Sequence, residues 1–172
     1  MWSYSKHNKV LILDMDGTLA DTYNYPDWAG ILRGHPEDPW TQSGNANPQE
    51  VYDMFLNLKP LIESQKLLEV SKRFDDVLVW SMAPWDATPQ VCNATYQAKK
   101  LWLDKHFGWI PNILVTRFNK SKSLVIEEDV LLKVYQSLPN YWSPTPFDTL
   151  IDDNEEVLNN FIGHGFLPPW IK

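Results

Sequence analysis

Four consecutive apolar residues that lead directly into an acidic motif constrain this chain more than any other feature. Residues 10–13 read Val-Leu-Ile-Leu, and residues 14–18 read Asp-Met-Asp-Gly-Thr. The apolar run is too short for a typical helix and has no amphipathic period, so it predicts a buried parallel strand. Alternate side chains of a strand share a face, so Asp14 and Asp16 should point the same way just beyond its end, where Gly17 permits a sharp turn.

Two carboxylates in this position suit phosphoryl chemistry. Like charges so close together repel each other, and a bound cation removes that cost. Asp14 can then attack phosphorus as a nucleophile while Asp16 shuttles protons. The alternative interpretation is a solvated acidic turn after a strand, and the rest of the chain has to decide between the two.

A long segment between residues 20 and 48 follows, rich in proline, glycine and aromatic residues. Its tyrosines and tryptophans argue against a disordered linker. A connection of this length inside a compact domain is typical of a lid or a binding loop. We therefore predict a small cap at residues 21–58, inserted into a core formed by residues 1–20 and 59–172.

Further apolar runs alternate with helical periods along the rest of the chain. We expect further strands at residues 77–80, 112–115, 149–151 and 166–167. We expect helices over residues 51–58, 60–74, 94–106, 123–138 and 157–162. This alternation predicts an α/β fold with a central parallel sheet covered by helices on both faces.

In sheets of this kind, ligands bind beyond the carboxyl ends of the strands. The groups expected there are Asp14, Asp16, Ser81, Arg117, Lys120, Asp152 and Asp153. The carboxylates of Asp14, Asp16 and the pair at 152–153 are hard oxygen ligands that suit Mg²⁺, and no cysteine or histidine spacing suggests zinc. Four separate strand ends thus supply groups suited to one phosphate and one metal ion.

Each remaining group has an expected role and an alternative. Ser81 would donate a hydrogen bond to a phosphoryl oxygen, and Lys120 would place a cation where charge builds in the transition state. Lys122 is a second candidate for that role, although we prefer Lys120. The pair at 152–153 can alternatively cap the last helix, and which of the two would bind the metal directly stays open. The acidic residues 127–129 are interpreted as a solvated helix start.

Composition limits the partners and the compartment. The 172 residues suffice for one well-buried domain, and the net charge of −7 argues against a general nucleic-acid binder. A small phosphorylated substrate needs only a local positive pocket. The single Cys92 fits a reducing compartment, the N-terminal segment lacks a signal-peptide pattern, and no apolar run reaches the length of a membrane span. We expect a soluble, cytoplasmic protein with no membrane partner and leave its oligomeric state open.

The motif at residues 14–18, together with Ser81, Lys120 and the Asp152-Asp153 pair, resembles the four motifs of the haloacid dehalogenase-like phosphohydrolases. The four motifs occur in the same order and span nearly the whole chain. The resemblance implies a Rossmann-like three-layer sandwich, a requirement for Mg²⁺, an aspartyl nucleophile and a cap that controls substrate choice.

Within that superfamily the chain is most similar to the 5'(3')-deoxyribonucleotidases. The pieces that carry this similarity are residues 19–21, 57–60, 81–84, 113–117 and 150–153. The similarity implies that Arg117 reaches the bound nucleotide and that Trp28 and Trp85 can stack on its base. The chain departs from the family at Asn119, where the family usually has its lysine.

The resulting hypothesis is a magnesium-dependent phosphomonoesterase that dephosphorylates deoxynucleoside or nucleoside monophosphates through an aspartyl-phosphate intermediate. One alternative is a phosphatase of the same superfamily that acts on another small phosphomonoester or on a nucleic-acid end phosphate. Another is a catalytically silent nucleotide-binding module. The sequence leaves open the base and sugar preference and the choice between a 5' and a 3' phosphate.

Overall fold

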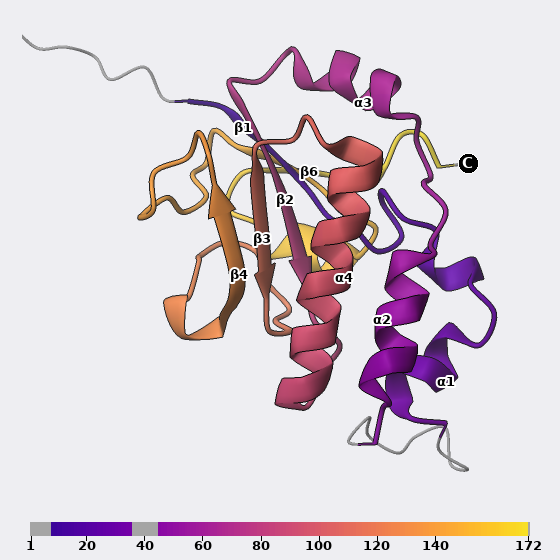
Figure 1. Cartoon of the computed structure of the whole chain (residues 1–172). Helices are drawn as coiled ribbons and strands as arrows, with labels where there is room; N and C mark the ends of the chain where they lie inside the picture. The colour runs from indigo at the N-terminus through magenta and orange to yellow at the C-terminus, as the bar shows by residue number, and fades with distance from the viewer. Residues whose placement is uncertain (1–7, 36–44, 172) are drawn as a thin grey trace, which may run out of the picture.

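The computed structural model describes residues 8–35 and 45–171, which fold around a central sheet (Figure 1). Residues 36–44 of the expected cap lie outside the described residues. The strands are β1 (Val10–Leu13), β2 (Asp76–Met82), β3 (Asn112–Thr116), β4 (Val130–Tyr135), β5 (Thr149–Ile151) and β6 (His164–Phe166). The helices are α1 (Trp28–Arg33), α2 (Pro48–Leu56), α3 (Ser64–Ser71), α4 (Pro89–Phe107) and α5 (Glu155–Asn159), with 3-10 turns η1 (Thr22–Asn24) and η2 (Glu127–Asp129).

The sheet has the order β4-β3-β2-β1-β5-β6. β1 lies at its centre and pairs in parallel with both β2 and β5, while β3 and β6 extend the parallel arrangement on either side. Only β4 runs antiparallel, along the free edge of β3. The predicted α/β class with a mostly parallel central sheet is therefore confirmed, and the architecture is compatible with a Rossmann-like sandwich.

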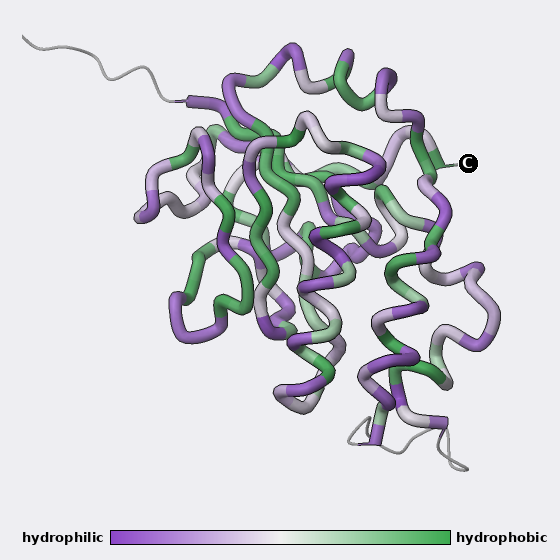
Figure 2. Tube along the Cα trace, in the orientation of Figure 1, coloured by the Kyte–Doolittle hydropathy of each residue, from purple (hydrophilic) through white to green (hydrophobic). Residues whose placement is uncertain are grey.

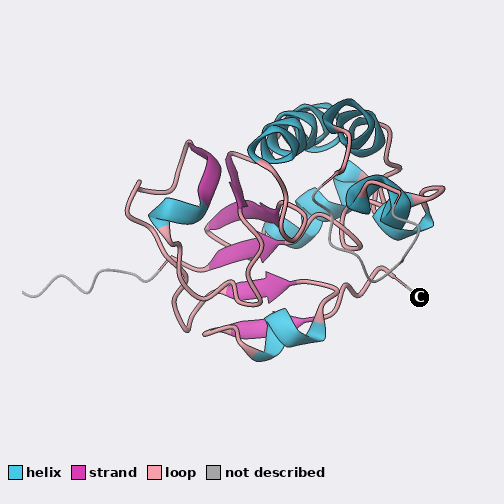
Figure 3. Cartoon of the chain, turned by 90° about the horizontal axis from the view of Figure 1, so that it is seen from below, coloured by secondary structure: helices cyan, strands magenta, loops and turns pink. Residues whose placement is uncertain are grey.

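Two hydrophobic clusters cover the two faces of the sheet, as the alternation of side chains in the strands requires. All four residues of β1 are fully buried, as expected for a central parallel strand. Leu11 and Leu13 face the cluster that includes residues of α2 and α4, whereas Val10 and Ile12 face the cluster that includes Val157 of α5. Figure 2 shows the hydrophobic strands at the centre, and Figure 3 shows helices on both sides of the sheet.

The inserted segment leaves and re-enters the core at one point. The Asp21 backbone N–H donates to the Lys59 carbonyl at 2.8 Å, and the Leu61 N–H donates to the Leu19 carbonyl at 2.7 Å. Between these ends α2 packs along α4, and Phe55 of α2 belongs to the same hydrophobic cluster as the sheet. In its described part the segment therefore shares the core of the sheet, and a separate cap is not confirmed.

The predicted helix over residues 123–138 is wrong. The acidic residues form only the short turn η2, and the following residues form β4, half-buried along its whole length. The spacing of Leu131, Tyr135 and Leu138 fits a helical period. The same stretch also suits an edge strand, because Val134 and Tyr135 are residue types common in strands. Pairing with β4 gives hydrogen-bond partners to backbone N–H and C=O groups of β3 that would otherwise lack them. This pairing selects a strand over a helix for the segment.

The other expected helices form with shifted ends. The helix expected from Pro60 begins instead at Ser64, because Pro60 forms a β-bridge with Ala20. The short strand expected at residues 166–167 lies at β6, two residues earlier. The longest helix, α4, has 19 residues, and none of the helices in residues 8–35 and 45–171 combines the length and apolar character needed to cross a bilayer.

Candidate active site

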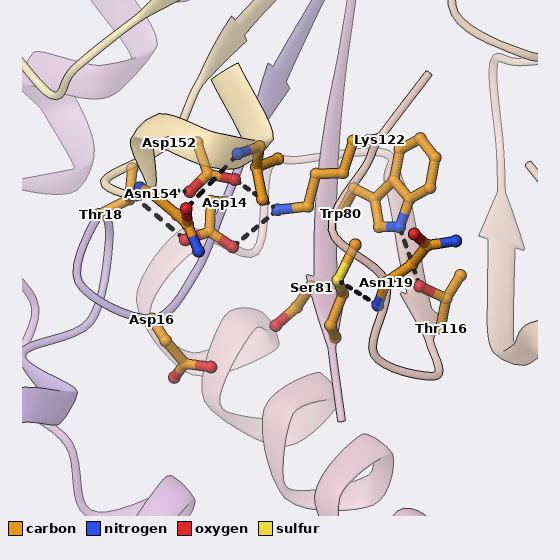
Figure 4. A network of polar contacts seen from close by, with 12 residues as sticks. Asp14, Asp16, Thr18, Trp80, Ser81, Thr116, Asn119, Lys122, Asp152 and Asn154 are labelled. Carbon is orange, nitrogen blue, oxygen red and sulfur yellow. Dashed lines mark hydrogen bonds and ion pairs between the residues drawn. The ribbon is translucent and has the colours of Figure 1, made fainter. Parts of the chain in front are cut away.

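Polar side chains gather at the edge of the sheet where the central parallel strands end (Figure 4). Asp14 directly follows β1, Ser81 is the penultimate residue of β2, and Asp152 directly follows β5. Because β1 pairs with both neighbours, its carboxyl end lies between theirs. The convergence of strand-end groups predicted from the sequence is therefore present for these three residues.

Three carboxylates form a cluster that can hold a cation. One oxygen from each of Asp14, Asp152 and Asp153 lies within 4.8 Å of the others. Asp14 and Asp152 are buried, with relative exposures of 8% and 2%. Carboxylate oxygens at this spacing from two adjacent strand ends fit a hard divalent cation such as Mg²⁺. The donor set fits the expected ion without defining its identity.

Gly17 makes room for this cluster. Its φ of +75° lies in the left-handed region that favours glycine. A Cβ atom at position 17 would lie 2.3 Å from Asp153 Oδ2 and 2.6 Å from the Tyr23 ring. Any side chain there would therefore displace one of the three clustered carboxylates, which explains why the turn after β1 requires glycine.

Lys122, and not Lys120, reaches the carboxylates. Lys122 Nζ donates to Asp14 Oδ1 and to Asp152 Oδ2, both at 2.8 Å, and its side chain is 2% exposed. The Lys120 side chain is 68% exposed and its Nζ lies 3.7 Å from Glu156. The preference for Lys120 is thus corrected. Two buried carboxylates need a cation between them, and the loop after β3 turns the second lysine inward to supply it.

Asp16 does not join the cluster, contrary to its expected role as a metal-binding carboxylate. Its Oδ1 accepts a hydrogen bond from Thr22 Oγ1 at 2.7 Å, and its Oδ2 accepts one from Lys99 Nζ at 2.6 Å. Asp16 is held by Thr22 and Lys99 and is not part of the three-carboxylate cluster found in the described residues. Asp16 still lines the cavity, as Asp14 does.

The electrostatics of the cluster favour a bound cation. Burial raises the pKa of Asp14 to about 6, opposed by the Lys122 ammonium and supported by the charge of Asp152. Burial, followed by the charge of Asp14, raises the pKa of Asp153 to about 8. Burial alone would lower the pKa of Lys122, but Asp14 and Asp152 outweigh it and raise the pKa, so this lysine is charged. A cation bound among these carboxylates would offset the repulsion between them that contributes to the raised pKa values of Asp14 and Asp153.

We expect Mg²⁺ to stabilise the protein more at pH 8 than at pH 5. The folded-state pKa values of Asp14 and Asp153 lie above the ordinary carboxyl value, so the metal-free protein loses stability as pH rises through about 6 and about 8. A cation that binds the ionised carboxylates removes that loss. At a free concentration of 100 times its Kd it adds about 2.7 kcal/mol, or about 5–10 °C in Tm.

Thermal unfolding with and without MgCl₂ at the two pH values measures this difference. Asp153→Asn is the control, since it removes one carboxylate of the cluster and should reduce the shift at pH 8. An equal Tm shift at both pH values would contradict the expectation.

A cavity of about 390 Å³ opens in front of the cluster. Trp28 and Trp85, the two tryptophans expected at the substrate, both line it, and so does Arg33. Arg117 is not among the described residues that line the cavity, and its backbone N–H donates to the Asp129 carbonyl. The arginine expected at the substrate is therefore placed elsewhere, and Arg33 of α1 occupies the wall of the cavity instead.

Of the two buried lysines at the site, Lys99 has no role among the sequence-based expectations, and Lys122 is only the second candidate there. Lys99 lies on α4 with no exposed surface, and it falls on the same helical stripe as the buried Thr95 and Trp102, four residues after one and three before the other. That spacing was a usable signal, because a lysine on an apolar stripe usually has a buried partner. Lys122 carries no comparable signal, because it follows a polar loop with no period.

No protein-family model matches this chain, and no curated protein matches it. The fold and the site define a class: an α/β protein with a mostly parallel sheet, in which three carboxylates that could hold a cation lie beside a cavity at the carboxyl ends of the central strands.

Proposed function

We propose that this chain is a phosphomonoesterase of the haloacid dehalogenase-like type that uses Mg²⁺ and Asp14 as its nucleophile. The observation that carries the proposal is the setting of Asp14. This carboxylate follows the central strand, lines the cavity and lies beside both the Lys122 ammonium and two further carboxylates. A nucleophile, a fixed cation and a set of metal ligands are the parts that phosphoryl transfer through a covalent intermediate needs.

The metal ion, when held by Asp14, Asp152 and Asp153, would offset the charges of these carboxylates and of the phosphate. Lys122 keeps one oxygen of Asp14 oriented and supplies a fixed positive charge where the phosphoryl oxygens develop negative charge. Ser81, near the end of β2, is the hydroxyl proposed for one phosphoryl oxygen. Its side chain is fully buried and is not among the described residues that line the cavity, so this contact requires the site to open at Ser81 when substrate binds.

Asp16 would transfer a proton in each of the two steps of the reaction. In the first, which requires Asp16 to be protonated at the start, a carboxylate oxygen of Asp14 bonds to phosphorus, the ester P–O bond breaks, and Asp16 gives its proton to the leaving alcohol oxygen. In the second, Asp16 takes a proton from water, the water oxygen bonds to phosphorus, and the acyl-phosphate bond to Asp14 breaks. Phosphate leaves, and both carboxyl groups return to their starting protonation states.

We further propose that the substrate is a deoxynucleoside or nucleoside monophosphate. The cavity volume of about 390 Å³ lies within the range of small-molecule sites. Trp28 and Trp85 offer flat surfaces on which a base can stack, at about 1–3 kcal/mol per base. Arg33 adds a cationic group to the wall. A net charge of −7 disfavours a long nucleic-acid chain as partner.

The test is phosphate release from a panel of monophosphates, with MgCl₂ or with EDTA. The panel holds 5'- and 3'-monophosphates of ribo- and deoxyribonucleosides, several sugar phosphates and an oligonucleotide with a 5' phosphate. The proposal expects release that requires Mg²⁺ and is fastest with nucleoside monophosphates. Faster phosphate release from sugar phosphates or from the oligonucleotide would contradict nucleoside monophosphates as the substrate class. Magnesium-dependent binding of a monophosphate without phosphate release from any substrate would contradict phosphatase activity.

A further inference from the structure

Lys99 has no exposed surface, yet it lies at the floor of the candidate site. Its Nζ donates three hydrogen bonds: to Asp16 Oδ2 at 2.6 Å, to Ser81 Oγ at 2.7 Å and to the Met82 carbonyl at 2.9 Å. These three contacts use all three protons of the ammonium. The same Nζ lies 4.5 Å from the centre of the Phe55 ring, which closes the other side.

A purely structural role does not account for this arrangement. Burying an ammonium costs several kcal/mol, and a buried ion pair is often no more stabilising than apolar residues of the same size. An apolar side chain at this position of α4 would pack between Phe55 and the sheet at lower cost. Lys99 instead contacts Asp16, the group proposed to transfer protons, and Ser81, the group proposed to bind a phosphoryl oxygen.

We propose that Lys99 is a positioning residue that holds Asp16 and Ser81 in their working orientations; this inference rests on the proposed function. Lys99 lacks access to the cavity, so it acts through these two groups and does not touch substrate. Asp16, by contrast, has a side chain that is 20% exposed and lines the cavity. The buried ammonium of Lys99 therefore holds the carboxyl group of Asp16, which faces the cavity, from below.

The contact with Ser81 fixes the polarity of its hydroxyl group. An ammonium can only donate, so Ser81 Oγ must accept from Lys99. The single O–H proton of Ser81 is then left to donate to another acceptor, and a phosphoryl oxygen is an acceptor. Without Lys99 the hydroxyl could turn its proton toward Asp16 or the Met82 carbonyl instead.

The contact with Lys99 holds the Asp16 carboxyl group at the second of its two oxygens. Thr22 holds Oδ1 and Lys99 holds Oδ2. With either donor removed, the carboxylate is free to rotate about its side-chain bonds. General acid catalysis requires the proton to lie within hydrogen-bond reach of the leaving oxygen, so such rotation slows proton transfer.

The test compares two leaving groups in a single turnover with enzyme in excess. A nucleoside leaves as an alcohol and needs a proton from Asp16, whereas p-nitrophenol leaves as an anion at neutral pH and needs none. We expect Lys99→Met to slow nucleoside release by about 100-fold more than it slows p-nitrophenolate release, the lower end of what a general acid contributes. Lys99→Arg, which keeps a cation, should recover most of the difference.

Lys100→Met is the matched control. Lys100 is the next residue of the same helix, but it forms an exposed ion pair with Asp104, and its replacement should change neither rate. Equal slowing of both substrates by Lys99→Met would show that Lys99 does not position Asp16 for proton transfer and would overturn the inference alone. Wild-type protein that acts on neither substrate would instead overturn the proposed function, and the inference with it.

Near-UV circular dichroism monitors the folding of each variant. If Lys99→Met does not fold, Lys99→Gln, which keeps hydrogen-bond donors without the charge, decides by the same ratio of rates. Failure of both variants to fold would show that the fold itself needs the ammonium, and that result contradicts a positioning role.

Discussion

Replacing Asp14 with asparagine is expected to lower the rate of phosphate release by at least about 1,000-fold, the scale seen when an enzyme loses its nucleophile. A carboxamide oxygen is a poor nucleophile and cannot form an acyl-phosphate, so the first step fails. The substitution also removes one of the three carboxylates that would hold the metal. The measurement is kcat on the best substrate of the panel at saturating Mg²⁺.

The loss should not come from unfolding. The carboxamide oxygen of the Asp14→Asn variant would still accept a hydrogen bond, and Lys122 would keep Asp152 as a partner at 2.8 Å. Because burial already disfavours the charged form of Asp14 and raises its pKa, removing that charge should leave the Tm of the metal-free protein at pH 8 unchanged or higher. Equal phosphate release by the variant and the wild type would refute Asp14 as the nucleophile.

The second large effect is expected for Lys122→Met, measured against Lys120→Met. Loss of the buried ammonium removes a fixed charge at the phosphoryl oxygens, which is worth about 100- to 1,000-fold in kcat. It also leaves Asp14 and Asp152 buried without their cation, a change that typically costs about 3–5 kcal/mol. Saturating Mg²⁺ should restore part of that stability, because the metal would neutralise the same carboxylates.

Lys120→Met is the matched control, since it removes a lysine two residues away that is exposed and 3.7 Å from Glu156. An exposed pair of this kind contributes about 0–1 kcal/mol. We expect its kinetics to equal those of the wild type. Comparable losses of activity in the two variants, or a loss confined to Lys120→Met, would show that the loop after β3 presents its lysines differently from the structure described above.

The parts of the fold that could be predicted from the sequence are those in which local pattern and burial agree. The apolar run of β1 ends in carboxylates, and a parallel sheet then places that end beside the ends of β2 and β5. The adjacency of the carboxyl ends of parallel strands is sufficient to predict that Asp14, Ser81 and Asp152 lie close together. The strand β4 could not be predicted, because the apolar residues of this stretch fit a helix and a strand equally. Backbone pairing with the edge of β3 selects the strand.

The parts of the site that could not be predicted depend on loop conformation and on partners far apart in sequence. Lys120 and Lys122 occupy the same polar loop, and nothing in their spacing says which one turns inward. The alternation of side chains in a strand predicts that Asp16 joins Asp14 at the metal, but β1 ends at Leu13, and the Asp16 carboxylate instead contacts Lys99, which is 83 residues further along. Arg117, expected at the substrate, is not among the described residues that line the cavity, whereas Arg33, for which the sequence gives no expectation, lines it.

The central claim is that Asp14, Asp152, Asp153, Ser81 and Lys122 form one centre for a divalent cation and a phosphoryl group. Crystals of the protein grown with Mn²⁺ and orthovanadate test it directly, because anomalous scattering locates both metals. We expect an Mn²⁺ peak about 2.0–2.3 Å from oxygens of Asp14 and of at least one of the other two carboxylates, with vanadium beside Asp14 and within hydrogen-bond reach of Lys122 Nζ. Manganese bound elsewhere, or vanadate on the far side of the cavity from Asp14, would contradict it.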